Sequence, residues 1–428
     1  MTLLCTPQAP AEPYAMPVIL DMEARAELID DWLEDRVQNV LPALMRREGI
    51  DLWLIIGREY NEDPVLKTML PATWLSARRR TMLLIHDPGS DQPLETLAVA
   101  RYNVGNVFSQ AWDPEEEPDQ WRRLADLIKE RDPAQIGINL SEDFALADGL
   151  PHTEHRLLVD ALAPDYAARL VSAEALAIGW LETRTPREMV VYQQICAIAH
   201  RIIAEGFSEA VIQPGVTTVS DVQWWYRERV RGLKLTSWFH PTVAIQRPDA
   251  TDTPPTVIRP GDLLHVDFGI TYLRLNTDTQ QHAYVLKPGE TMAPEALRKA
   301  LASGNRLQDI LTANFISGRT GNEILAAARA QALDEGINPS IYTHPIGYHG
   351  HAAGPTIGLW DQQDGVPGKG DYPLYPNTAH SIELAAILEL PGWSGPMRIK
   401  LEEDAFFDGK SVRYIDGRQT VLHLIPRQ

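Results

Sequence analysis

The chain has 428 residues, of which 44% are hydrophobic, and a formal net charge of −19 at pH 7. This length is sufficient for two domains with buried cores, and the apolar fraction excludes wholesale disorder. No basic block offsets the acidic charge, which argues against nucleic acid or an anionic membrane as the main partner.

The chain shows no pattern typical of export or of membrane insertion. It contains no run of about eighteen apolar residues, and its start lacks a basic region followed by a long apolar core. The only cysteines, Cys5 and Cys196, form no disulfide framework and have no zinc-type spacing. We therefore expect a cytoplasmic protein without a transmembrane helix.

The first 175 residues predict an α/β domain with a mixed sheet. An amphipathic helix is expected over residues 20–48, with Asp21 as its N-cap and an interruption at Pro42. Further elements are a helix over residues 121–130 and strands over residues 51–57, 81–86, 94–100 and 135–140. Helices mixed with strands in this way indicate an α/β domain. No glycine-rich turn joins a strand to a helix, so no nucleotide-binding motif is present.

Three consecutive arginines, Arg78, Arg79 and Arg80, precede one of these strands. They either contact an anion or form a solvated surface cluster near a strand end. The sequence leaves both readings open.

A second domain is expected over residues 176–428. Its predicted helices occupy residues 152–211, with a break near Pro186, and then residues 219–230 and 290–335; the first begins before the boundary. Strands are expected over residues 239–245 and 263–270, and the last ninety residues alternate short strands with long loops.

Two aspartates, Asp267 and Asp278, stand eleven residues apart on a predicted β-hairpin. The alternation of Val266 and Phe268 indicates the first strand, and the apolar run 283–286 indicates the end of the second. Two carboxylates in a half-buried sheet repel each other and lose hydration, and a bound cation removes both penalties. The alternatives are a salt-bridged pair or two exposed strand-end residues.

Three later segments carry further candidate ligands. His351 lies among glycine and alanine residues, which allow a ligand to approach closely. Glu383 interrupts an apolar strand, where a carboxylate is unfavourable unless it is paired or coordinating. Glu402 belongs to the charged segment 400–404, which by itself also fits a solvated edge strand. A packed or surface role is the usual alternative for the lone histidine.

Taken together, the candidates are four carboxylates and one imidazole: Asp267, Asp278, His351, Glu383 and Glu402. Because each carboxylate can chelate or bridge, the set suits two divalent ions. Oxygen-rich ligands with one nitrogen favour Mn²⁺, while Co²⁺, Fe²⁺ and Zn²⁺ remain possible.

The order and spacing of these residues resemble the pita-bread metallopeptidase family, which includes aminopeptidase P, prolidase, methionine aminopeptidase and creatinase. The resemblance covers residues of about 175–428. Its motifs are Gly261-Asp262, the aspartate pair, Gly-His-x-x-Gly at residues 350–354, Glu383, and the segment 400–404. Residues 184–188 resemble the family's entry into its catalytic domain, and the preceding domain resembles that of the prolidase, aminopeptidase P and creatinase branch. The resemblance implies an α/β amino-terminal domain followed by an α+β pita-bread catalytic domain.

The resemblance also implies a dinuclear metallopeptidase that cleaves Xaa–Pro bonds in short peptides, with a metal-bridging hydroxide as nucleophile. Asp267 would chelate one ion, and Asp278 and Glu402 would bridge both. His351 and Glu383 would hold the second ion, and Glu383 would also move a proton to the leaving amine. The family is often dimeric, so we expect a homodimer.

Two departures from the family concern its auxiliary histidines. The histidine that usually follows the ligand histidine by seven residues is replaced by Gly358, and the loop 252–256 carries no histidine. His265, on the same strand face as Asp267, and His349 are candidates to substitute, and His240, His344 and His380 also lie close to the motifs in sequence. Core or surface roles are the alternative for each.

The missing histidines keep other functions open. One is C–N hydrolysis or a lyase reaction on a small non-peptide substrate, and another is a non-catalytic binding module. Trp360 and Trp393 either line an apolar pocket near the site or pack as ordinary core residues.

Overall fold

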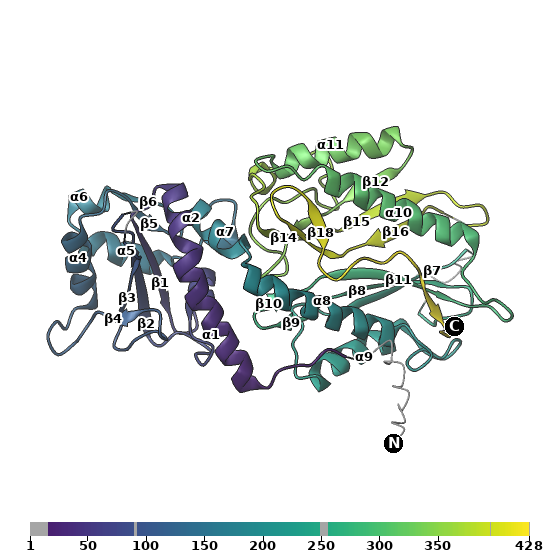
Figure 1. Ribbon diagram of the computed structural model, residues 1–428, viewed down its shortest axis with the longest axis horizontal. Helices are drawn as coiled ribbons and strands as arrows, with labels where there is room; N and C mark the ends of the chain where they lie inside the picture. Colours follow the sequence, from purple (N-terminus) through teal and green to yellow (C-terminus); the bar gives the residue numbers. More distant parts are fainter. Residues whose placement is uncertain (1–15, 90–91, 249–255, 394, 428) are drawn as a thin grey trace, which may run out of the picture.

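The computed structural model describes residues 16–89, 92–248, 256–393 and 395–427. Figure 1 shows two domains side by side, a smaller amino-terminal one and a larger carboxy-terminal one, with helix α1 running obliquely beside the junction. Within the described ranges, no helix is both long and apolar enough to cross a membrane.

The amino-terminal domain is built on a six-stranded sheet with the order β4-β3-β2-β1-β5-β6. The central strand β1 pairs antiparallel with β2 and parallel with β5, which confirms the predicted mixed sheet. The six strands of this sheet are β1 (Leu52–Arg58), β2 (Arg80–His86), β3 (Glu95–Val99), β4 (Ser109–Gln110), β5 (Ile136–Ile138) and β6 (Leu170–Ser172). The last strand lies where the sequence predicts helix, and that prediction is wrong: three residues are too few to show a strand period.

The helices of this domain are α1 (Met22–Asn39), α2 (Leu41–Glu48), α3 (Pro64–Met69), α4 (Gln120–Arg131), α5 (His152–Ala161), α6 (Pro164–Ala167) and α7 (Glu174–Glu182). The predicted interruption is confirmed, because Pro42 occupies the first turn of α2. The predicted N-cap is confirmed as well: the Asp21 carboxylate accepts a hydrogen bond from the Ala24 N–H at 2.9 Å.

Helix α7 packs into the amino-terminal core, where Leu176, Ile178 and Trp180 join side chains of β1. We therefore propose that the domain boundary lies at residues 183–185 rather than at residue 175. Across this boundary the fully buried Arg36 on α1 forms an ion pair with Glu188, which lies in the first turn of the helix after the boundary. Arg36 Nη1 is 3.1 Å from Glu188 Oε2. The pair ties the two domains together, since neither charge can be solvated separately.

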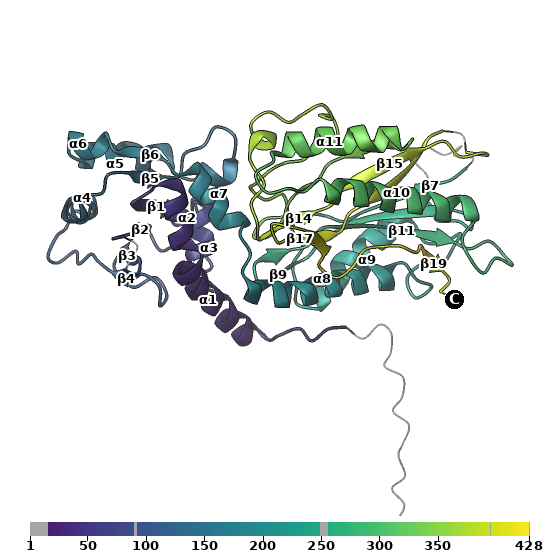
Figure 2. The same cartoon turned by 45° about the horizontal axis from the view of Figure 1, so that its top comes forward.

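In its described residues, the carboxy-terminal domain contains four small sheets and four long helices. The sheets are β19-β11-β8-β7, β12-β15-β16, β13-β14-β17-β18 and the two-stranded sheet of β9 (Thr271–Tyr272) and β10 (Leu275–Asn276). Helices α10 (Glu295–Ala313) and α11 (Gly321–Asp334) lie on one side of these strands, and α8 (Pro186–Gly206) and α9 (Val219–Gly232) lie on the other (Figure 2). The main strands are β7 (Thr242–Gln246), β8 (Leu263–Phe268), β11 (Thr279–Val285), β12 (Asn338–Ile341), β13 (His344–Pro345), β14 (Thr378–Ser381), β15 (Leu384–Leu388), β16 (Met397–Leu401), β17 (Asp404–Phe407), β18 (Val412–Tyr414) and β19 (His423–Ile425).

Two chain segments that run side by side each pass from one sheet into another, and they do so at the same point along their length. Strands β14 and β17 pair in one sheet, and their continuations β15 and β16 pair in another. The breaks fall at residues 382–383 and 402–403. The sequence predicts that Glu383 lies inside a strand, and this prediction is wrong. Glu383 lies at the break between β14 and β15, as Glu402 lies at the break between β16 and β17. The side chains of both glutamates are therefore not constrained by the alternation of a regular strand, and the two breaks lie beside each other.

Candidate metal centre

The predicted hairpin of the two aspartates is confirmed. Strands β8 and β11 pair antiparallel, with Gln280 opposite Asp267, and Asp278 lies just before β11. The isolated bridge between Gln280 and Glu402 brings the third segment alongside. As a result, one oxygen each of Asp267, Asp278 and Glu402 lies within 4.8 Å of the others.

Gln280 is a site residue that the sequence analysis missed. Its Nε2 donates to Glu383 Oε1 and to Glu402 Oε2, both at 2.7 Å. One amide therefore fixes two glutamates relative to each other. The sequence gives no signal for this role, because an amide between a hairpin and two distant breaks is recognised only once the strands are paired.

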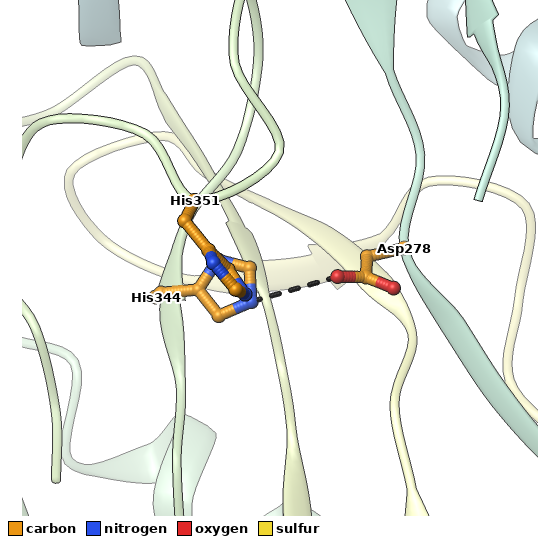
Figure 3. Close-up of side chains that lie close together, drawn as sticks. All are labelled: Asp278, His344 and His351. Atoms are coloured by element: carbon orange, nitrogen blue, oxygen red, sulfur yellow. Dashed lines mark ion pairs between the residues drawn. The ribbon is translucent and has the colours of Figure 1, made fainter. Parts of the chain in front are cut away.

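Two histidines reach the carboxylates, and both point toward Asp278 (Figure 3). His344 Nε2 lies 3.4 Å from Glu402 Oε1 and 3.7 Å from Asp278 Oδ2. It also forms a group with Glu383 and Glu402 whose ligand atoms lie within 4.8 Å of one another, whereas the group containing His351 joins it only to Asp278 and His344. The two imidazole rings are 4.7 Å apart and nearly perpendicular.

The sequence around His344 contains the same pattern as the sequence around His351. A glycine follows His344 by three residues, as one follows His351, and His351 stands seven residues after His344. Placing His344 in the ligand position therefore puts His351 where the family carries its auxiliary histidine. Around His351 the small residues admit Trp238, whose ring would collide with a Cβ at Gly350.

The other two histidine candidates lie outside the groups of potential ligands. His265 Nε2 meets Gln280 Oε1 at 2.8 Å, so it contacts the glutamates only through that amide. Because Gln280 uses its amide N–H groups on carboxylates, its oxygen accepts and His265 donates. Burial, together with the charges of Lys67 and Arg184, lowers the pKa of His349 to about 4. The loop 252–256 lies almost entirely outside the described residues.

Burial and mutual repulsion govern the charge state of the acids. Burial, together with the neighbouring Glu402, raises the pKa of Asp267 to about 7. The same two causes raise the pKa of Asp278 and of Glu383 well above their ordinary values. Burial and the nearby His344 lower the pKa of His351 to about 4, which leaves a neutral imidazole at pH 7.

The donor set fits divalent cations. Within the described part of the chain, Asp278 Oδ1 and His344 Nε2 are buried and have no hydrogen-bond partner. Both residues belong to groups of potential ligands, so a cation would satisfy these atoms and remove the repulsion between carboxylates. Second-layer hydrogen bonds orient the acids: Ser381 Oγ donates to Glu402 Oε1 at 2.8 Å, and Asp404 accepts from the Asp278 N–H at 3.3 Å.

A cavity of about 340 Å³ opens beside the two histidines. Its walls come from both domains and include Phe144, Leu146, Tyr342, His344, His351, Leu359 and Lys369. Trp360 is 76% exposed and Trp393 packs at the edge of a core cluster. Neither tryptophan is among the residues that line this cavity, so ordinary surface and core roles account for them.

Comparisons with known proteins show which family the chain belongs to. The model of metallopeptidase family M24 matches residues 192–415, which is more than half of the chain. Among curated proteins, none matches the sequence.

Solved structures match over nearly the whole chain. An X-Pro aminopeptidase from Thermotoga maritima has a TM-score of 0.62 at 17% identity, covering 89% of this chain and 99% of that one. An Xaa-Pro dipeptidase from Bacillus anthracis gives 0.55 at 17% identity, covering 94% and 100%. A prolidase from Pyrococcus horikoshii gives 0.54 at 15% identity, covering 92% and 99%.

These likenesses confirm the predicted fold class, an α/β amino-terminal domain followed by a pita-bread domain. The matched segment contains the hairpin, both sheet breaks and both histidines of the centre. The chain is therefore a member of metallopeptidase family M24.

Proposed function

We propose that this protein is a dinuclear metal-dependent peptidase that cleaves Xaa–Pro bonds in short peptides. The observation that carries the proposal is the convergence of four carboxylates and His344 in overlapping groups of potential ligands. The similarity of the whole chain to an X-Pro aminopeptidase and to prolidases supports the choice of substrate class.

Asp267, Asp278, Glu383, Glu402 and His344 would hold the two ions. We assign the nitrogen ligand to His344 rather than to His351, because His344 is buried and approaches both Glu402 and Asp278. Mn²⁺ is the expected metal, since oxygen ligands predominate. Bound divalent ions would lower the pKa of a water molecule and polarise the scissile carbonyl.

The residues beside the ligands supply positioning and proton transfer. His351, neutral at pH 7 and open to the cavity, is suited to donate a hydrogen bond to the substrate carbonyl. Gln280 holds one oxygen of Glu383, which leaves the other oxygen available to carry a proton to the leaving amine. His265 acts behind Gln280 as a positioning residue.

The cavity favours a short substrate. Its volume of about 340 Å³ lies near the lower end of the range for small-ligand sites, which suits a dipeptide or tripeptide. Phe144, Leu146 and Leu359 provide apolar walls for a prolyl ring, and Lys369 provides a cation for the substrate carboxylate. We infer that a dipeptide is the preferred length.

The test is a substrate screen with the full-length protein loaded with Mn²⁺. Xaa–Pro dipeptides and tripeptides are compared with matched Xaa–Ala peptides, and we expect turnover of the proline series with dipeptides favoured. If the protein holds metal but turns over no peptide, the peptidase proposal fails. Small non-peptide amides in the same screen test the alternative C–N hydrolase, and sedimentation velocity tests the expected homodimer.

A further inference from the structure

The amino-terminal domain contains a second cavity, of about 440 Å³, whose lining shares no residue with the cavity at the metal centre. It includes five arginines: Arg58, Arg78, Arg79, Arg80 and Arg101. The sheet explains their convergence. Arg80 begins β2 opposite Arg58 at the end of β1, and Arg101 follows shortly after β3, which pairs with β2.

Only part of this positive charge is neutralised. Glu154, whose side chain is fully buried, pairs with Arg58 at 3.1 Å and with Arg80 at 2.7 Å. In the described part of the chain, Arg78, Arg79 and Arg101 have no ion pair with a carboxylate, and Glu59 is the one acid in the lining. A chain with a net charge of −19 thus gathers an excess of positive charge in one hollow.

Aromatic rings hold two of these arginines in place. The Arg78 guanidinium lies over the Trp74 ring at 4.3 Å and over the Tyr102 ring at 5.6 Å, and Arg101 lies over Trp112 at 5.5 Å. Stacking uses the flat face of a guanidinium and leaves its N–H groups, which lie in the plane, free to donate. The rings therefore reduce the conformational entropy that these side chains would lose on binding a ligand.

The backbone between the arginines is also constrained. Arg79 has a φ of +55°, a left-handed conformation that a residue with a Cβ rarely adopts. Its carbonyl accepts a hydrogen bond from the Glu59 N–H at 2.7 Å, which ties it to the segment after β1. Such strain is retained where the surrounding structure imposes it, and it concentrates at binding sites.

We propose that this cavity binds a small polyvalent oxyanion, a molecule with two or more carboxylate or phosphate groups. Each guanidinium can grip one such group with two parallel hydrogen bonds, and Arg78 and Arg101 offer two separate forks. Arg79 adds a third positive charge. A monovalent anion would engage one fork and leave the repulsion among the others in place. The proposal is independent of the peptidase function.

The test is isothermal titration calorimetry of the full-length, metal-loaded protein at constant ionic strength. The probes are pyrophosphate, propane-1,2,3-tricarboxylate and, as the monovalent control, acetate. We expect saturable binding of at least one polyvalent probe and weaker binding of acetate. The Arg78→Gln/Arg101→Gln double variant should weaken the polyvalent probe by about tenfold or more.

The matched control is Arg156→Gln, which removes an exposed arginine of the same domain that lies outside the cavity lining. It should leave the affinity unchanged. A preference between the two polyvalent probes would identify the ligand as phosphate-bearing or carboxylate-bearing. The proposal is overturned if no probe binds, if acetate binds equally well, or if the double variant gives the same heat. The last result would place the anion elsewhere, such as at the metal ions.

Discussion

The molecule contains two charge clusters of opposite sign, the carboxylates of the candidate metal centre and the arginines of the amino-terminal cavity. They differ in what offsets the repulsion between their like charges. In the carboxy-terminal domain, two of the four carboxylates are buried and two are half-buried, and burial raises the pKa of Asp267 to about 7. In the amino-terminal domain, Arg78 and Arg101 are exposed and stacked on aromatic rings. Buried acids require either protons or a cation, whereas solvated arginines persist without a ligand. The acidic cluster therefore predicts its ligand class more strongly than the basic one.

The largest expected effect comes from removing a bridging carboxylate. Glu402→Ala or Asp278→Ala should lower kcat/KM on the best Xaa–Pro substrate by on the order of 10³-fold or more, because metal binding is lost. Metal content by mass spectrometry accompanies the assay. The control is Glu389→Ala, an exposed glutamate just beyond β15. Normal activity with unchanged metal content in either variant would contradict the assigned centre.

The next prediction separates the two histidines. His351→Ala should lower kcat by about 10²-fold while metal stays bound, because the proposed role of this residue is to contact the substrate rather than the ions. His344→Ala should lose activity together with metal. Steady-state kinetics of both variants, each assayed with and without excess Mn²⁺, measure the difference. If both variants lose activity equally and excess Mn²⁺ restores activity only in His351→Ala, then His351 rather than His344 is the metal ligand.

Removal of the amide that links the two glutamates should have an intermediate effect. Gln280→Ala should weaken metal affinity by roughly 10- to 100-fold, as is usual for residues that orient ligands. Activity as a function of Mn²⁺ concentration measures this change, and saturating metal should restore most of kcat. Gln362→Ala, which removes an exposed amide that contacts none of the potential ligands through its side chain, serves as the control. Unaltered metal affinity would show that the carboxylates hold their positions unaided.

The metal-free protein should show the cost of the buried acids directly. Asp267 has a folded-state pKa of about 7 against an ordinary value of 3.8, so the folded state binds more protons between these values. The contribution of Asp267 to the free energy of unfolding is therefore fully present below about pH 4 and falls by on the order of a few kcal/mol as the pH rises to 7. Thermal unfolding with EDTA and with Mn²⁺ across this range should show a stabilisation by metal that grows with pH. A gap that shrinks with pH would contradict the account.

The smallest effect concerns Glu182, a buried acid of α7 without a cation site. Burial raises its pKa to about 8, and its Oε2 has no hydrogen-bond partner within the described chain. Stability from its protonated form is present below about pH 4.5 and is lost as the pH rises through 8. Glu182→Gln should therefore stabilise the protein by about 2 kcal/mol at pH 9 and by little at pH 5. Chemical denaturation at both pH values, with Glu389→Gln as control, measures this difference.

The acids of the centre were predictable because their chemistry is local. Asp267 and Asp278 appear in an alternating pattern, and a buried carboxylate is unfavourable in any fold without a partner. The nitrogen ligand is less predictable, because two histidines, each followed by glycine at the third position, compete for one place; we propose His344 on the basis of the strand pairing that places it beside the carboxylates. Gln280 depends on three segments meeting, which no local pattern encodes.

Four of the six strands of the amino-terminal domain, β1, β2, β3 and β5, were predictable from the sequence, but the cavity was not. The arginines at residues 78–80 are visible in the sequence, while Arg58 and Arg101 join them only through the strand order. The short strand β6 was missed because three residues show no period. The place of the domain boundary depends on which core α7 joins, and its apolar sequence suits either one.

The metal content of purified wild-type, His344→Ala and His351→Ala proteins tests the central claim most directly. After loading with Mn²⁺ and exhaustive dialysis, we predict two ions per wild-type chain, two per chain in His351→Ala, and fewer than two in His344→Ala. A wild-type protein that retains no divalent ion, or a His344→Ala variant that retains both while His351→Ala loses one, would contradict the proposed centre.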